Sequence, residues 1–159
     1  MTDIPDHHRK FLVVVDKSPE CKVALRFATR RAQHTGGRVT LLCVAQSGEF
    51  QQWRGVEEIM KDEAHQEAES LGHNAAKFVH EMSGIYPEIV IEHGRTAECL
   101  LNLIKADRDI SILVLGAGIS KEGPGPLVSL LAGPQSGGYP IPVTIVPGGL
   151  SDEAIDALA

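Results

Sequence analysis

A chain of 159 residues with a formal net charge of −6 is long enough for one hydrophobic core and too acidic for a nucleic-acid-binding surface. Aromatic residues make up only 4% of the chain, which favours an aliphatic parallel sheet over a sandwich or barrel rich in Trp and Tyr. No apolar segment reaches the ~18 residues that a membrane span requires. We therefore expect a single cytoplasmic domain over residues 1–159, with a flexible N-terminal arm (1–9), a C-terminal tail (148–159), and no membrane or nucleic-acid partner. The cysteines form no C-x-x-C pair and predict buried, reduced thiols: Cys21, Cys43 and Cys99.

The first predicted unit is a strand followed by a helix. Residues 11–15 (FLVVV) form the continuous apolar run that is typical of a strand buried on both faces. Asp16 ends this run. Ser18 is the predicted N-cap and Pro19 the first helical residue of an amphipathic helix, which ends at two glycines, residues 36–37.

The middle of the chain alternates between strands and helices. Residues 39–45 (VTLLCVA) repeat the buried-strand pattern, so the sheet is predicted to be parallel from its second strand. Apolar residues at steps of three and four predict a long surface helix over 56–83. Residues 88–93 (EIVIEH) predict a short edge strand, and a further helix then leads to a buried strand over 110–115.

The last part of the chain is rich in glycine. Residues 116–125 form a glycine-rich loop, Pro126 suits the first position of a short helix, and Gly133-Pro134 ends that helix. Residues 143–146 form the fifth predicted strand, placed at a sheet edge because prolines flank it. Ser151 is a candidate N-cap for a last helical turn.

Five strands that alternate with helices predict an α/β fold: a five-stranded, parallel, doubly wound sheet with helices on both faces. In the strand order 3-2-1-4-5, the winding reverses between the first and fourth strands, and ligands bind at that point. Asp16 and the segment from Gly116 to Gly118 follow these two strands, so we expect them to converge. Glycines there allow backbone N–H groups to approach a phosphate closely.

Between residues 10 and 147 the chain resembles the universal stress protein family. The matching segments are VVVDKS, where the family has V-D-x-S, the second-strand LLCVA, the helix after His93-Gly94, LVLGA before the glycine loop, and a final P-V-x-x-V strand. The resemblance implies the order 3-2-1-4-5 and a homodimer paired through the last strand, Val143–Val146. It also implies a stress-response role, and in one branch of the family the binding of ATP with Mg²⁺.

The resemblance also implies a set of nucleotide-binding residues. Asp16 would contact the ribose or the phosphates and the Mg²⁺ shell, and the backbone of Val44 would meet the adenine. The family loop is written G-x-x-G-x9-G-[ST], and the nine-residue spacing is kept between Gly123 and Gly133. The complete predicted set is Asp16, Ser18, Val44, Gly116, Gly118, Gly123, Gly133, Gln135 and Ser136.

Two departures from the family loop bear on this prediction. Six residues separate Gly116 from Gly123, where the family has two. Pro134 replaces the family's Ser or Thr and offers neither a hydroxyl nor an N–H to a phosphate. Gln135 and Ser136 are the predicted substitutes for these donors, and Lys121 is the predicted source of positive charge.

Two functions remain open from the sequence. One is a regulator that binds ATP or a related adenine nucleotide, and the other is a homodimeric interaction module that binds no nucleotide. The chain lacks a Walker G-K-[ST] ending, a Rossmann glycine pattern after its first strand and a nucleophile elbow. We therefore expect no enzyme activity, no catalytic residues and no metal site formed by the protein alone.

Overall fold

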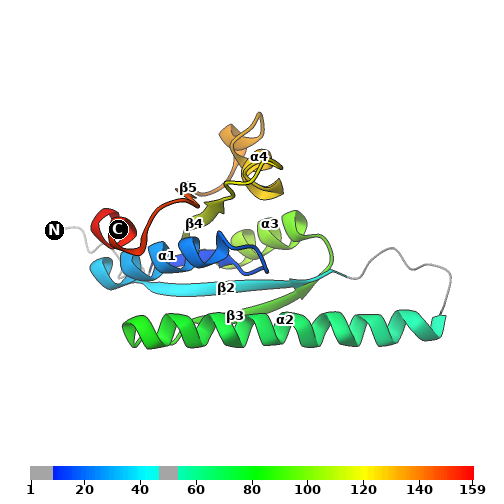
Figure 1. The fold of residues 1–159 in the computed structure, drawn as a ribbon. Coiled ribbons are helices and arrows are strands. Elements are labelled where there is room, and N and C mark those ends of the chain that lie inside the picture. Colours follow the sequence, from blue (N-terminus) through cyan, green and yellow to red (C-terminus); the bar gives the residue numbers. More distant parts are fainter. Residues whose placement is uncertain (1–8, 47–53) are drawn as a thin grey trace.

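The structure, a computed structural model, describes residues 9–46 and 54–159 and contains the predicted five-stranded parallel sheet in the order β3-β2-β1-β4-β5 (Figure 1). Apart from Arg9, the predicted N-terminal arm lies outside the described residues. The elements in chain order are β1 (Lys10–Val14), α1 (Cys21–Thr35), β2 (Arg38–Ala45), α2 (Arg54–Ser83), β3 (Glu88–His93), α3 (Thr96–Ala106), β4 (Ile110–Ala117), α4 (Pro126–Leu131), the 3₁₀ turn η1 (Ser136–Gly138), β5 (Val143–Pro147) and α5 (Asp152–Leu158).

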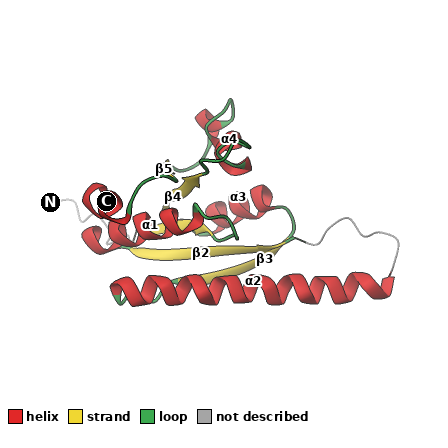
Figure 2. Ribbon diagram, in the orientation of Figure 1, coloured by secondary structure: helices red, strands yellow, loops and turns green. Residues whose placement is uncertain are grey.

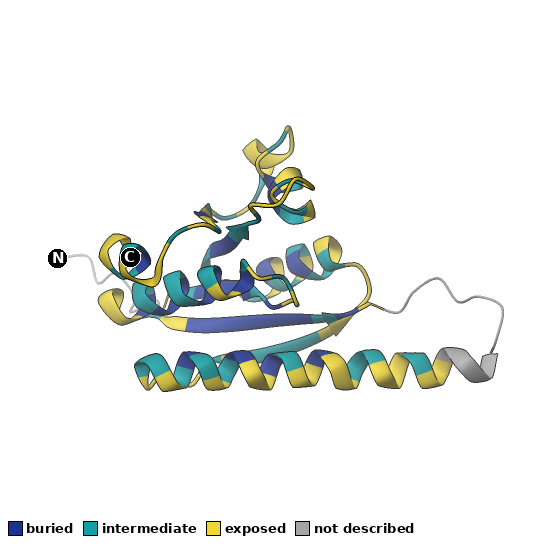
Figure 3. Cartoon of the chain, viewed as in Figure 1, coloured by how far each residue is buried: buried dark blue, intermediate teal, exposed yellow. Residues whose placement is uncertain are grey.

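Successive side chains of each strand point to opposite faces of the sheet, so a hydrophobic core forms on each face. Phe11 and Val13 of β1 pack in the core that includes side chains of α1 and α2. Leu12 points the other way, into the core that includes side chains of α3 and α4. Figure 2 shows α2 and α3 on opposite sides of the sheet, and Figure 3 shows how strongly β2 is buried between them. The expected doubly wound α/β fold is therefore confirmed.

Two of the predicted helix boundaries are confirmed by their geometry. Gly36 follows the last residue of α1 with φ of +70°, a left-handed conformation that glycine adopts without a Cβ penalty. Ser151 caps α5, because its Oγ accepts a hydrogen bond of 3.2 Å from the N–H of Ala154.

The start of α1 differs from the prediction. Ser18 is not the N-cap and Pro19 is not the first helical residue, because α1 begins at Cys21 with Glu20 in the N-cap position. Oδ1 of Asp16 accepts hydrogen bonds from both the N–H of Ser18, at 2.8 Å, and its hydroxyl. The hydroxyl therefore closes a tight turn after β1, and the helix starts at Cys21, two residues later than the predicted Pro19.

The C-terminal helix α5 is fastened to α1 by ion pairs. The guanidinium of Arg26 donates two hydrogen bonds to the carboxylate of Asp156, at 2.8 and 2.7 Å, and Arg30 donates a third at 3.0 Å. Ile155 is fully buried beneath this cluster. Within the part of the chain that the structure describes, no helix is both long enough and apolar enough to cross a membrane.

Candidate functional site

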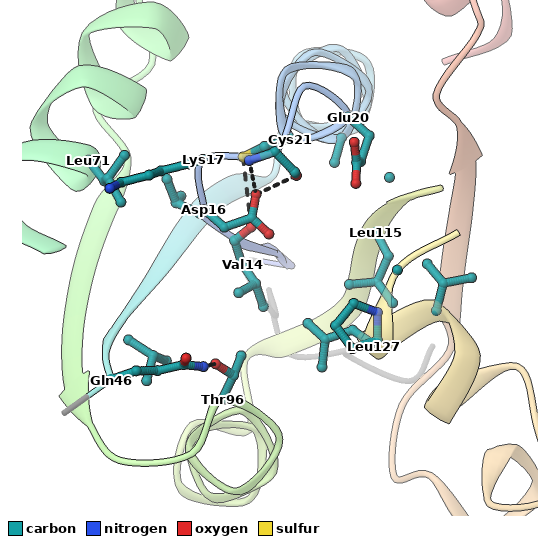
Figure 4. Close-up of a pocket in the computed structure, with 18 of the residues that line it drawn as sticks. Val14, Asp16, Lys17, Glu20, Cys21, Gln46, Leu71, Thr96, Leu115 and Leu127 are labelled. Atoms are coloured by element: carbon teal, nitrogen blue, oxygen red, sulfur yellow. Dashed lines mark hydrogen bonds between the residues drawn. The ribbon is translucent and has the colours of Figure 1, made fainter. Parts of the chain in front are cut away.

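A cavity of about 650 Å³ opens at the carboxyl ends of β1, β2 and β4. Asp16, just past β1, and Gly116, near the end of β4, both line it. Figure 4 shows Asp16 directed into this space between the start of α1 and the sheet. The cavity therefore lies at the point where the winding of the sheet reverses, which is where doubly wound proteins bind ligands.

Most of the cavity wall is aliphatic. Val14, Val44 and Leu115 contribute from the strands, Leu71 from α2, and Leu127 from α4. Figure 4 labels Val14, Leu71, Leu115 and Leu127 on this wall. The β-branched residues are those of the buried strands, and Leu71 follows the apolar stripe of α2. Such walls suit a flat, weakly polar group such as a heterocyclic base.

Polar side chains gather on two sides of this wall. On the side of α1, Lys17 forms an ion pair with Glu67 of α2, and both side chains are at least half exposed. An exposed pair of this kind adds little to stability. It links the loop after β1 to the helix opposite and places two charges on the cavity lining.

On another side, Gln46 and Thr96 bridge the end of β2 and the start of α3. The Nε2 of Gln46 donates a hydrogen bond of 2.7 Å to Oγ1 of Thr96. Figure 4 shows this pair on the side of the cavity away from Glu20. An amide and a hydroxyl here offer uncharged groups for hydrogen bonds with a ligand.

The glycine segment packs against the start of α1. Strand β4 runs to Ala117, two residues beyond the predicted end, so Gly116 pairs with Val146 in the sheet. A Cβ at Gly116 would come closer than 3.0 Å to the main-chain carbonyl oxygen of Glu20. Gly116 is therefore required for the close approach of two backbones.

Two amides of the glycine loop are engaged within the loop. The N–H of Gly118 donates to the carbonyl oxygen of Pro124 at 3.0 Å, and the N–H of Gly123 donates to Ser120 at 3.1 Å. An Oε1 atom of Glu20 lies 3.1 Å from the position of a Cβ at Gly118. A carboxylate thus stands beside the loop where the sequence predicts a phosphate.

The structure gathers only some of the predicted site residues. Asp16, Ser18, Val44 and Gly116 line the cavity. The remaining predicted residues are not among its lining: Gly118, Gly123, Gly133, Gln135 and Ser136. Gln135 instead lines a second cavity, of about 610 Å³, between α3 and α4, and Lys121 is exposed on the loop.

The side chains that sequence reasoning missed are the charged and polar ones. Lys17, Glu20, Gln46, Glu67 and Thr96 all line the cavity. Lys17 and Glu20 flank the predicted Ser18 in sequence, which was the only local signal for them. Glu67 and Thr96 come from distant segments, so only the packing of α2 and α3 places them here.

The thiol in the cavity lining is a poor nucleophile. Burial is the main reason that the pKa of Cys21 rises to about 11, and burial likewise raises the pKa of Cys43 to about 11. Cys99 is only partly buried, and burial raises its pKa as well. Among the side chains that the structure describes, no group of three His, Cys, Asp or Glu residues is arranged to hold a metal ion.

The fold and the cavity define a doubly wound α/β domain with an aliphatic, carboxylate-rimmed binding site at its switch point. The sequence model of the universal stress protein family matches residues 7–128, more than half of the chain. The chain belongs to the universal stress protein family. No curated protein sequence matches it closely enough to count as a relative.

Solved structures of family members share the fold. Universal stress protein UspA from Lactobacillus plantarum is 20% identical, with a TM-score of 0.72 over 87% of this chain and 97% of that one. The Archaeoglobus fulgidus universal stress protein in complex with dAMP is 19% identical, with a TM-score of 0.63 over 87% and 97%. A universal stress protein in complex with cAMP is 15% identical, with a TM-score of 0.57 over 89% and 98%.

Proposed function

We propose that this protein is a cytoplasmic stress-response regulator that binds an adenine nucleotide in the cavity at the switch point. Ligand occupancy would bias the glycine loop and α4, and through them the binding of a partner protein. The proposal contains no catalytic step, and Asp16 acts in it as a ligand-binding residue.

One observation carries this proposal. Asp16, the family's ligand-contacting aspartate by resemblance, lies on the lining of a cavity of about 650 Å³ that also exposes the end of β2 at Val44. The volume is within the range of small-molecule sites. A carboxylate beside an aliphatic slot supports the recognition of a nucleoside, because it can accept hydrogen bonds from ribose hydroxyls while the base packs on the wall.

The two ligand complexes among the similar structures support the class of ligand. One of those proteins was solved with dAMP and the other with cAMP. Both ligands carry adenine and a single phosphate. At 19% and 15% identity these proteins share the fold with this chain, so the transfer of their ligand class is part of the proposal.

The second candidate function is a homodimeric interaction module that binds no nucleotide. The internal hydrogen bonds of Gly118 and Gly123 favour it, since they leave the loop closed on itself. The outer edge of β5 favours it too, because an edge strand with an exposed apolar residue, Ile145, suits pairing with a second copy.

Calorimetric titration with AMP and with Mg-ATP separates the two functions. Saturable binding, with a matching rise in the melting temperature, is expected for the first function and no binding for the second. The Asp16→Ala variant should lose the effect. As a control, Asp62→Ala removes an exposed carboxylate on α2 outside the cavity lining and should bind as the wild type does. If Asp16→Ala bound the nucleotide with unchanged affinity, the binding site would have to lie outside this cavity.

A further inference from the structure

We propose that the cavity selects adenine ligands with few phosphates, so that adenosine and AMP bind more tightly than ATP. This inference rests on the proposed function and narrows its ligand class. It makes Glu20, which the resemblance does not assign to the site, a specificity-determining residue.

The first support is the charge of the lining. Among the described residues, three carboxylates line the cavity, those of Asp16, Glu20 and Glu67, against one ammonium group, that of Lys17. Lys17 is already paired with Glu67. The described lining therefore carries an excess of two negative charges, and each added phosphate increases its repulsion of the ligand.

The second support is the position of Glu20 against the glycine loop. Its carbonyl oxygen fills the space beside Gly116, and its carboxylate lies beside Gly118. Glu20 is partly buried and directly precedes α1, where the helix dipole favours a negative charge. The carboxylate thus places a negative charge beside the glycine loop, next to the predicted phosphate position.

The third support is that four backbone positions in and beside the loop offer no free donor. The N–H groups of Gly118 and Gly123 are used inside the loop, and Pro124 and Pro126 have none. At these four positions a polyphosphate would lose hydration without gaining a hydrogen bond, which is unfavourable for a multiply charged group.

The same carboxylates suit the uncharged part of the ligand. Carboxylates only accept hydrogen bonds, and the ribose hydroxyls and the adenine amino group are donors. Val14, Leu71 and Leu127 supply aliphatic surface for the base. The carboxylates that repel a polyphosphate thus accept hydrogen bonds from a nucleoside. The same lining therefore accounts for the binding of the nucleoside and for the weaker binding of ATP.

The test is calorimetric titration of the wild-type protein with adenosine, AMP, ADP and ATP in buffer with EDTA and low salt. We expect affinity to fall along this series, with ATP at least about tenfold weaker than adenosine. Raising the salt concentration should reduce this difference in affinity, because salt screens the repulsion between the carboxylates and the phosphates. This comparison needs no variant.

Glu20→Gln then tests the assigned residue, since it removes the charge and keeps the shape. It should reduce the ratio of the dissociation constants of ATP and adenosine by about threefold or more. Glu81→Gln, an exposed control on α2 outside the cavity lining, should leave this ratio unchanged.

ATP affinity equal to or above that of adenosine, or a ratio of dissociation constants that Glu20→Gln leaves unchanged, overturns the inference and leaves the proposed function intact. Failure of all four compounds to bind overturns the proposed function and this inference with it.

Discussion

The main-chain carbonyl oxygen of Glu20 lies directly against the α-carbon of Gly116, within the space that a Cβ would occupy. This contact joins the start of α1 to the end of β4 across the switch point of the sheet. It gives Gly116 a packing role that is independent of any ligand. A glycine before a loop can thus be required by the fold itself.

Gly116→Ala should destabilise the protein by about 3 kcal/mol, because the added methyl group meets backbone atoms that cannot rotate away. Urea unfolding monitored by circular dichroism measures this change in the free energy of unfolding. A loss below about 0.5 kcal/mol would show that α1 can shift freely from β4.

Gly137→Ala is the matched control for this prediction. No atom lies within 4 Å of the position of its Cβ, and its φ is outside the left-handed region. We expect its free energy of unfolding to stay within about 0.5 kcal/mol of the wild-type value.

The fold was predictable because its signals are local. The buried runs at 11–15, 39–45 and 110–115 identified the central strands, and the right-handed crossover rule with the family resemblance fixed their order. The predicted start of α1 was wrong because the side chain of Ser18, the predicted N-cap, bonds to Asp16 and not to the helix. Asp16 captured the hydroxyl of Ser18 and so displaced the helix to Cys21.

The site was predictable only in part. Asp16 and Gly116 lie at the carboxyl ends of neighbouring strands, and topology alone brings them to one cavity. Glu20 could not be assigned, because its role depends on how closely α1 approaches β4. The hydrogen bond between Gly118 and Pro124 that closes the loop could not be predicted either. A glycine-rich sequence is compatible both with an open, anion-binding loop and with a closed turn.

The outer edge of β5 is predicted to pair with a second copy, giving a homodimer. In a two-fold symmetric, antiparallel pair centred on the strand, Ile145 lies opposite its own copy. Ile145→Glu places two like charges there and should convert a dimer into a monomer in sedimentation velocity at micromolar concentration.

Ile59→Glu provides the control for the dimer, since Ile59 is 60% exposed on α2, more than Ile145 at 38%. It should leave the sedimentation coefficient of the dimer unchanged. A wild-type protein that sediments as a monomer would contradict the predicted interface.

The buried thiols should resist modification in the native protein. With a pKa of about 11, Cys21 and Cys43 are each only about 0.1% thiolate at pH 8, and both are almost fully buried. In a Cys99→Ala variant, Ellman's reagent should find no rapidly reacting thiol in the native state and two in urea. A fast native reaction would mean that the cavity opens enough to expose Cys21.

The attachment of α5 to α1 should depend on pH through Asp156. Its hydrogen bonds with Arg26, and secondarily with Arg30, lower the pKa of its carboxyl from 3.8 to about 2. Because the folded-state pKa is the lower one, the stabilisation is complete above about pH 4. It is lost as the pH falls from about 4 towards 2.

Asp156→Asn should therefore lower the melting temperature at pH 6, and its difference from the wild type should shrink below pH 4 and vanish near pH 2. Melting curves by circular dichroism between pH 2 and 6 measure this difference. Asp62→Asn, an exposed substitution on α2, removes the same charge without touching α5 and controls for net charge. A difference for Asp156→Asn that stays constant over this range would mean that α5 is held by the burial of Ile155 alone, with no contribution from the ion pairs.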